Sequence, residues 1–273
     1  MRFNLRSIVL VALVALIALG SAGCSKLKAR DMLNKGVQAF KNGQTDQAIE
    51  FFKQAKEFDP SLLNAYLYLA ASYASQYIPG APSEDNMKKG EAAIAEYKRV
   101  LEIDAGNISA LEGLGSIYYN MAGQPFDPEK FEEAKKYQKR RMEITPNEPE
   151  PYYWVGVINW AMAFRANGEL RAKFNSTARK PIKENEPFPP AQRDEFTKSH
   201  GALIEEGVDS LQKAIRLRSD YEDAMAYLNL LYRQKADIVA SAEEREQLLD
   251  EADRLVDRVK EIKQKKMEAP PKA

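Results

Sequence analysis

The chain has 273 residues and a mass of 30.8 kDa, enough for one or two domains with a buried core. Forty Lys and Arg balance forty Asp and Glu, so there is no net basic field that would concentrate nucleic acid. A single cysteine and a single histidine exclude a disulfide framework, a thiolate-rich metal site and any site that needs two imidazoles. We therefore expect no metal, no other cofactor and no nucleic-acid partner.

The first 23 residues have the pattern of an export signal. Arg2 and Arg6 precede an unbroken apolar run over residues 8–19, and small residues follow it up to Cys24. The run falls short of the roughly 20 apolar residues that cross a bilayer as a helix. The pattern therefore favours a cleaved signal at residues 1–23 over a permanent membrane span.

The only cysteine follows this segment directly. Ser21-Ala22-Gly23-Cys24 resembles the lipobox of bacterial lipoproteins, with Ser21 where that motif usually has Leu. The resemblance implies cleavage before Cys24 and attachment of lipid, palmitate included, to its sulfur. Ser25, rather than Asp, after the cysteine implies delivery to the outer membrane, at its periplasmic face. The alternative is an ordinary secretory signal that leaves Cys24 as a free thiol.

Past the signal the hydrophobic periodicity is helical, and no alternating apolar pattern with hairpin turns occurs. We therefore predict an all-α protein. Residues 24–28 are interpreted as a lipidated tether that holds the first helices against the membrane, and residues 29–262 as the folded array. Residues 263–273 are rich in lysine and contain two prolines, so they are expected to form a frayed polar tail.

Internal repetition gives the array its organisation. Gly36 and Ala48 are small residues that would let two helix axes approach closely. Phe52 would fill the space between repeats, and Pro60 would block further helix. On these residues the segment 29–62 resembles the tetratricopeptide repeat, which pairs two antiparallel helices.

Similar patterns recur down the chain. The resemblance implies a right-handed α-solenoid of about five helix pairs with insertions between helices, more than the roughly three pairs needed for a continuous core. The expected units are residues 29–62, 63–105, 108–146, 149–219 and 222–262. The fourth unit carries an insertion at about residues 165–203, whose basic start and prolines predict a loop or a short helix.

In such arrays the first helix of each pair lines a concave groove, which we expect to be apolar and aromatic. The residues assigned to this partner-binding groove are Leu33, Val37, Phe40, Leu67, Tyr68, Tyr119, Tyr153, Trp154, Val157, Trp160, Leu230 and Arg233. A long exposed apolar groove is expected to be covered by something, which favours a protein or peptide partner with Trp154 or Trp160 as anchors. Leu33, Val37 and Glu112 stand where the family's carboxylate clamp needs Lys and Asn, so that mode of binding is not expected.

The main hypothesis is a non-enzymatic, lipid-anchored envelope scaffold, in outer-membrane, pilus or secretion assembly. A second hypothesis is a small-ligand-binding protein in which the 165–203 insertion lids the groove, using Phe174, Phe188 or Phe196. A cell-wall enzyme centred on His200 is the least favoured, because no convincing catalytic constellation accompanies it. The two tryptophans are also compatible with ordinary helix–helix core.

Overall fold

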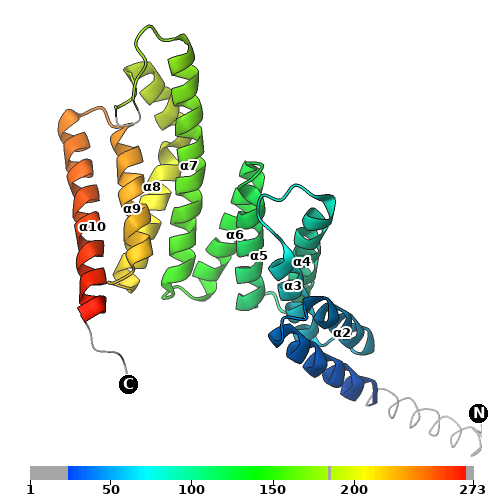
Figure 1. The fold of residues 1–273 in the computed structure, drawn as a ribbon. Coiled ribbons are helices and arrows are strands. Elements are labelled where there is room, and N and C mark those ends of the chain that lie inside the picture. The colour runs from blue at the N-terminus through cyan, green and yellow to red at the C-terminus, as the bar shows by residue number, and fades with distance from the viewer. Residues whose placement is uncertain (1–23, 184–185, 269–273) are drawn as a thin grey trace, which may run out of the picture. The chain divides into compact units, whose positions relative to one another are not determined.

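The computed structural model describes residues 24–183 and 186–268, and within these ranges all regular structure is helical (Figure 1). The all-α prediction is confirmed. The chain divides into two compact units, Met1–Phe126 (unit 1) and Asp127–Ala273 (unit 2). The predicted export signal lies outside the described residues. Among the helices that are described, none combines the length and apolar character needed to cross a bilayer.

Unit 1 is a succession of helices that pack on their neighbours in chain order. A first helix over residues 24–41 is followed by α2 (Thr45–Phe58), α3 (Leu63–Gln76), α4 (Glu84–Ile103) and α5 (Ile108–Ala122). The small residue predicted at Gly36 is needed, because a Cβ placed there would lie 2.4 Å from Cε1 of Phe52. Gly43 turns the chain between the first two helices with φ of 75°, a conformation that favours glycine.

Residues 24–28 are not the tether that the sequence predicts. They are helical and continuous with the helix that extends to residue 41. The Ser25 hydroxyl donates a hydrogen bond to the carbonyl oxygen of Phe58 at 2.5 Å, and the Lys28 ammonium lies 4.2 Å from the centre of the Phe58 ring. These contacts satisfy a carbonyl at the end of α2 and favour helix over extended chain. The exposed Cys24 is therefore held beside the folded body.

The segment between α3 and α4 is a loop. Asn86 in the first turn of α4 fixes it: its side-chain oxygen accepts from the amide of Ile78 at 2.7 Å, and its side-chain nitrogen donates to the carbonyls of Ile78 at 2.8 Å and Ala81 at 3.0 Å. The Ser83 hydroxyl caps α4 by accepting from the Asn86 amide.

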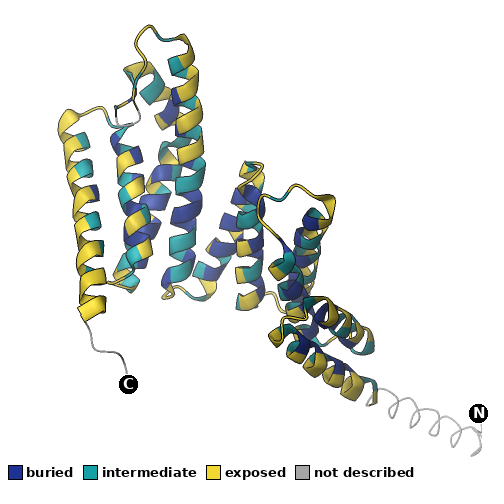
Figure 2. Ribbon diagram, viewed as in Figure 1, coloured by how far each residue is buried: buried dark blue, intermediate teal, exposed yellow. Residues whose placement is uncertain are grey.

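Unit 2 contains longer helices. They are α6 (Pro128–Ile144), α7 (Pro149–Thr177), α8 (Pro190–Leu217), α9 (Glu222–Ala236) and α10 (Ala242–Glu268). Consecutive helices pack on one another, and α7 also packs on α9. A Cβ on Gly156 would lie 2.3 Å from Cγ of Leu211, and one on Gly207 would lie 2.7 Å from Cδ1 of Leu231. Close helix crossings thus recur at small residues, and burial concentrates on the faces that meet neighbouring helices (Figure 2).

The insertion at residues 165–203, predicted to be a loop or a short helix, consists mostly of two long helices. α7 continues to Thr177 and α8 begins at Pro190, so both helices extend far into the insertion (Figure 1). Of the residues between them, the described ones, 178–183 and 186–189, are not helical and form the connecting turn. Pro181 lies beyond the end of α7, and Pro190 is the first residue of α8, where a proline is tolerated. Residues 165–177 precede these prolines and include strong helix formers such as Ala, Leu, Arg and Lys. The basic residues of this segment are therefore compatible with a continuous helix.

Residues 263–268, predicted to belong to a frayed tail, are helical. α10 continues through residue 262 and ends at Glu268. The Lys266 ammonium lies 2.5 Å from the Glu222 carboxylate at the start of α9, which ties the end of the antiparallel α10 to its neighbour. The lysines that suggested a solvated tail therefore include one with a defined partner.

Candidate functional site

The residues assigned to the groove lie on both units. Leu33, Val37, Phe40, Leu67, Tyr68 and Tyr119 belong to unit 1, and Tyr153, Trp154, Val157, Trp160, Leu230 and Arg233 belong to unit 2. All except Val157 are half-buried or exposed. Val157 is 1% exposed and is a core residue, so its assignment to the groove is wrong. The reason is that α6, α8 and α9 all pack on α7, which buries a wider arc of that helix than a single partner helix would.

In unit 1 the assigned residues are largely engaged in packing. Leu33, Val37 and Phe40 pack against the buried cluster that contains Phe52. Tyr68 is 38% exposed and stacks on Phe52, with ring centroids 5.5 Å apart and an interplanar angle of 15°. These side chains form the outer layer of the core in this unit.

Unit 2 gathers aromatic rings where α7 and α9 pack together. We call this set the aromatic strip: Tyr153, Trp154, Trp160 and Phe164 of α7, with Tyr221 and Tyr227 at and after the start of α9. The Tyr153 ring centroid lies 5.3 Å from that of Trp154 and 5.8 Å from that of Tyr227. The Trp160 ring lies 5.2 Å from Tyr227 and stacks on Phe164 at 5.3 Å. The rings therefore form one connected series.

Three members of the aromatic strip, Phe164, Tyr221 and Tyr227, are absent from the sequence prediction. Phe164 follows Trp160 by one helical turn, so their spacing was a usable signal. The basic residues that begin at Arg165 obscure this signal, because they predict an insertion rather than a continued helix. Tyr227 lies on the neighbouring helix, and only the packing of α7 on α9 brings it to the Trp160 ring.

The strip ends at an open pocket of about 870 Å³ within unit 2, a size typical of ligand sites. Its lining comes from α7, the following turn, α9 and α10, and comprises Trp160, Phe164, Asn167, Gly168, Arg171, Ala172, Asn175, Ile182, Leu230, Arg233, Gln234, Asp237, Arg245 and Leu249. The charged residues of the lining are three arginines and one aspartate, so the lining carries a net positive charge. Trp160, Leu230 and Arg233 are the groove predictions that the structure brings together here.

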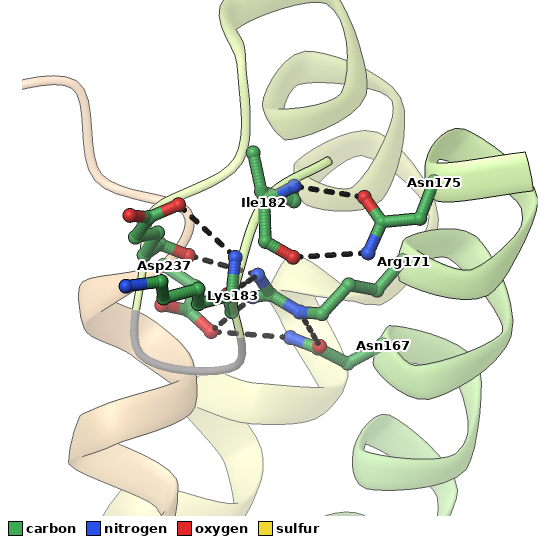
Figure 3. A network of polar contacts seen from close by, with 7 residues as sticks. Asn167, Arg171, Asn175, Ile182, Lys183 and Asp237 are labelled. Atoms are coloured by element: carbon green, nitrogen blue, oxygen red, sulfur yellow. Dashed lines mark hydrogen bonds and ion pairs between the residues drawn. The ribbon is translucent and has the colours of Figure 1, made fainter. Parts of the chain in front are cut away.

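A buried ion pair between Arg171 and Asp237 forms part of the pocket lining. Figure 3 shows the polar contacts around it. Arg171 Nη2 lies 3.1 Å from the Asp237 carboxylate, and the Asn167 side-chain amide donates to the same oxygen at 3.3 Å. Burial raises the pKa of Asp237 above its ordinary value of 3.8, while Arg171, Asn167 and Arg245 act in the opposite direction. The pair joins the extended part of α7 to the C-terminal end of α9.

The same arginine holds the turn between α7 and α8. Arg171 Nη1 donates to the carbonyl oxygens of Lys183 at 2.6 Å and Glu186 at 2.9 Å. Asn175 exchanges two hydrogen bonds of 2.9 Å with the backbone of Ile182 (Figure 3). The Arg171 guanidinium also lies 4.5 Å from the centre of the Phe188 ring. Arg171 and Asn175, which both line the pocket, therefore attach this turn to α7 by hydrogen bonds.

A second buried polar cluster of unit 2 links α6, α7 and α8. The Lys135 ammonium lies 3.2 Å from the Asn159 side-chain oxygen and 3.4 Å from the Glu206 carboxylate. Burial raises the pKa of Glu206, but the hydrogen bonds from Lys139 and Asn159 outweigh it and hold the pKa below its ordinary value. The polar groups of this cluster are hydrogen-bonded or ion-paired to one another, as expected of a structural role: Lys135, Asn159 and Glu206.

The contacts of His200, the residue on which the enzyme hypothesis depended, are those of a packed side chain. Its ring stacks on Phe196 with centroids 4.7 Å apart, and its Nδ1 lies 2.8 Å from the Ser199 hydroxyl. The Ser199 hydroxyl also donates to the carbonyl oxygen of Glu195, one turn earlier on α8, at 2.9 Å. Burial lowers the pKa of His200. Within the described ranges no cluster of potential metal ligands occurs.

The comparisons with known proteins agree with this architecture. A sequence model of the tetratricopeptide repeat matches residues 32–62, inside the first predicted unit. No curated protein matches the sequence. The crystal structure of MamA protein is similar with a TM-score of 0.58 at 16% identity, over 90% of this chain and 97% of that chain. The structure of MamA 41-end from Desulfovibrio magneticus RS-1 gives 0.57 at 13% identity, over 87% and 96%.

A third similar structure is YrrB, described as a TPR protein with an unusual peptide-binding site. It gives a TM-score of 0.51 at 14% identity, over 85% of this chain and 90% of that chain. Likeness at such low identity concerns the fold. The chain therefore carries a recognisable tetratricopeptide repeat near its start and has the helix-pair fold of tetratricopeptide repeat proteins, as the sequence resemblance implied.

Proposed function

We propose that the protein is a non-enzymatic scaffold of the cell envelope, anchored by lipid on Cys24, that binds a protein or peptide partner along the aromatic strip and in its pocket. The observation that carries the proposal is the exposure of apolar side chains at the pocket, with Phe164 60% exposed and Leu230 37% exposed. Large aromatic anchors contribute most of the energy of many interfaces. The Phe164 ring already stacks on Trp160. Binding would therefore cost little side-chain conformational entropy at this ring.

Two features support a peptide rather than an enzymatic substrate. The strip and pocket lie on a helix-pair scaffold, and YrrB, which shares this fold, is described as having a peptide-binding site. The polar clusters of unit 2 around Lys135 and around Arg171 use their groups to join helices. By the sequence resemblance to lipoproteins, the setting is the periplasmic face of the outer membrane, in an assembly process of the envelope.

Phe164→Ala and Leu230→Ala are each expected to weaken binding of the native partner by roughly tenfold or more, because each removes an exposed anchor at the pocket. Folding should change little, since both side chains are exposed. The partner is first trapped by cross-linking in native membranes and identified by mass spectrometry. Its affinity for wild type and variants is then measured by calorimetry.

Ile144→Ala is the matched control for this test. Ile144 is 42% exposed at the end of α6 in the same unit and lies outside the pocket lining. Its replacement should leave the affinity unchanged. Equal losses in Ile144→Ala and Phe164→Ala, or unchanged affinity in all three variants, would contradict the proposed site.

Cys24→Ala is expected to abolish lipid labelling and membrane retention. Because Cys24 is exposed, its sulfur is accessible to an acyl chain. Anchoring by more than one chain is durable, at about 0.8 kcal/mol for each buried CH₂. Labelled palmitate should enter the wild type alone, which should sediment with outer-membrane vesicles, while the variant should be found in the soluble fraction. Equal labelling of wild type and variant would exclude this anchor.

A small-ligand-binding function remains the second candidate, because insertion residues such as Asn167, Arg171 and Ile182 line the pocket. Of the three aromatic residues predicted for the lid, Phe188 and Phe196 are buried in the core of unit 2. The third, Phe174, is half-buried and does not belong to the pocket lining. Native mass spectrometry of the purified protein discriminates the two functions. A bound small molecule that is lost in Phe164→Ala would favour this candidate over a peptide.

A further inference from the structure

We infer that the first described helix of unit 1 contacts the membrane directly, with Leu27 inserted into the bilayer and Lys26 and Arg30 bound to anionic lipid headgroups. The inference rests on the proposed function, because the proposed anchor on Cys24 brings this part of the chain to a membrane. It adds a contact made by the protein itself. Three features carry it: an exposed apolar side chain, the local charge, and the helical backbone that holds both.

Leu27 is an apolar side chain on the outward side of this helix. It is 68% exposed, whereas Ala29 and Met32 of the same helix are buried. At 3.6 residues per turn, Leu27 points about 140–160° away from those two core residues. Cys24 precedes Leu27 by three positions, so the two share one side of the helix. The proposed anchor therefore brings a leucine to the bilayer, and its transfer out of water is favourable.

The charge of the same helix favours anionic lipids. Residues 24–41 contain five basic residues and one acidic residue, although the whole chain carries equal numbers of the two. Lys26 and Arg30 lie on either side of Leu27 in the sequence and are exposed. Neither side chain has an ion pair or a hydrogen bond within the described ranges. Basic side chains in this state strengthen binding to an anionic membrane surface, by about fivefold each.

Neither Asp31 nor Asp59 neutralises these two cations. Asp31, the one acidic residue of the helix, is paired with Lys35 at 2.8 Å. Asp59, which follows α2, accepts hydrogen bonds from the Ser61 hydroxyl at 2.6 Å and the Ser61 amide at 3.0 Å. The hydroxyl is the main cause of the lowered pKa of Asp59, and the charges of the two cations add to it without direct contact. The surface around Leu27 therefore keeps a positive charge.

The backbone of this segment is fixed by the fold. Residues 24–28 are helical, and the Ser25 hydroxyl donates to the carbonyl oxygen of Phe58 at the end of α2. A flexible tether would let the folded body move away from the bilayer. This helix instead holds Leu27 about 5 Å along its axis from Cys24. Lipid on Cys24 and insertion of Leu27 therefore act together, as two membrane attachments commonly do.

Acetylation by a water-soluble reagent tests the inference on the full chain. The protein is reconstituted into vesicles of phosphatidylcholine, alone or mixed with phosphatidylglycerol, and the rate at each lysine is read by mass spectrometry. Lys26 should react at least about fivefold more slowly in the mixed vesicles, and raised salt should cancel the difference. Lys88 and Lys89 are internal controls with unchanged rates, because they lie near Asp46 at the start of α2, the opposite end from Phe58.

Leu27→Ser is expected to remove most of the protection of Lys26 while the protein stays attached to the vesicles. Folding should change little, since Leu27 is 68% exposed. Ile78→Ser is the matched control. Ile78 is 64% exposed in the same unit, in the loop that follows α3. The end of α3 meets the start of α2 through a 2.6 Å hydrogen bond from Gln76 to Asp46. Its replacement should leave Lys26 protected, and equal losses in the two variants would contradict insertion of Leu27.

Other outcomes overturn the inference in distinguishable ways. Equal rates at Lys26 in both kinds of vesicle, with the protein bound to both, reject the contact with anionic lipid and leave the proposed anchor standing. Protection in native membranes but not in vesicles assigns the surface to a protein partner. Protection that grows with protein concentration at constant lipid assigns it to a second copy of the chain. If the wild type binds neither kind of vesicle, both the inference and the proposed anchor fail.

Discussion

Replacing Arg171 by alanine is expected to lower the free energy of unfolding of unit 2 by about 3–5 kcal/mol, the usual cost of removing one member of a buried ion pair. The substitution leaves the Asp237 carboxylate buried without its closest cation. It also removes the donors to the carbonyls of Lys183 and Glu186 and the contact with the Phe188 ring. The turn between α7 and α8 loses its main attachment at the same time.

Urea unfolding followed by tryptophan fluorescence measures this effect, because both tryptophans of the chain, Trp154 and Trp160, belong to unit 2. The matched control is Arg165→Ala on the same helix. Arg165 forms an ion pair with Glu169 at 2.5 Å, but more than half of each side chain is exposed. Its loss should change stability by no more than about 0.5 kcal/mol. Similar losses in the two variants would show that the Arg171 pair has no special structural role.

The pH dependence gives an independent check on the cause. The pKa of Asp237 is raised in the folded protein, so the folded state binds this proton more tightly than the unfolded chain does, and stability falls as the pH rises from 3.8 through the folded pKa. Without Arg171 the folded pKa should rise further. The destabilisation by Arg171→Ala should therefore be smaller near pH 4 than at about pH 7. The reverse order would contradict a charge-based origin.

Helix content was predictable from local pattern, whereas helix length in the insertion was not. Gly36, Phe52 and Pro60 identified the first repeat because close helix crossings admit few side chains, and the structure places Phe52 directly over Gly36. The insertion at residues 165–203 combines good helix formers with later prolines. Its helices are stabilised by tertiary contacts such as those of Arg171, which sequence periodicity does not report.

In the candidate site, too, local pattern predicted some residues, and tertiary packing alone determined others. Trp160 and Leu230 were predicted from their positions on first helices, and both line the pocket. Asp237 and Gln234 were not predicted. Asp237 follows the last turn of α9 and is 66 positions from Arg171, so no local spacing signals their pairing. The burial of Gln234 is a property of packing alone, because a glutamine on a helix is usually a solvated residue.

Phe52→Ala is expected to destabilise unit 1 by about 3–5 kcal/mol, the range for removing a buried aromatic side chain. Phe52 is fully buried, its ring packs over Gly36, and it stacks on Tyr68. Since both tryptophans are in unit 2, unfolding of unit 1 is followed by hydrogen exchange of the amides of α2 and α3. Phe164→Ala, the same substitution at a 60% exposed ring, is the control and should leave these amides unaffected.

The double variant separates loss of a contact from loss of the helix crossing itself. Gly36→Ala alone should cost about 1–3 kcal/mol, because the new methyl would lie 2.4 Å from Cε1 and 2.6 Å from Cδ1 of Phe52. With Phe52 already replaced by alanine, the methyl meets no ring and enters the vacated space, while alanine favours helix over glycine by roughly 0.5–1 kcal/mol. Gly36→Ala should therefore change sign and stabilise Phe52→Ala. Additive losses would show that the backbones at this crossing, rather than the ring, exclude a side chain at position 36.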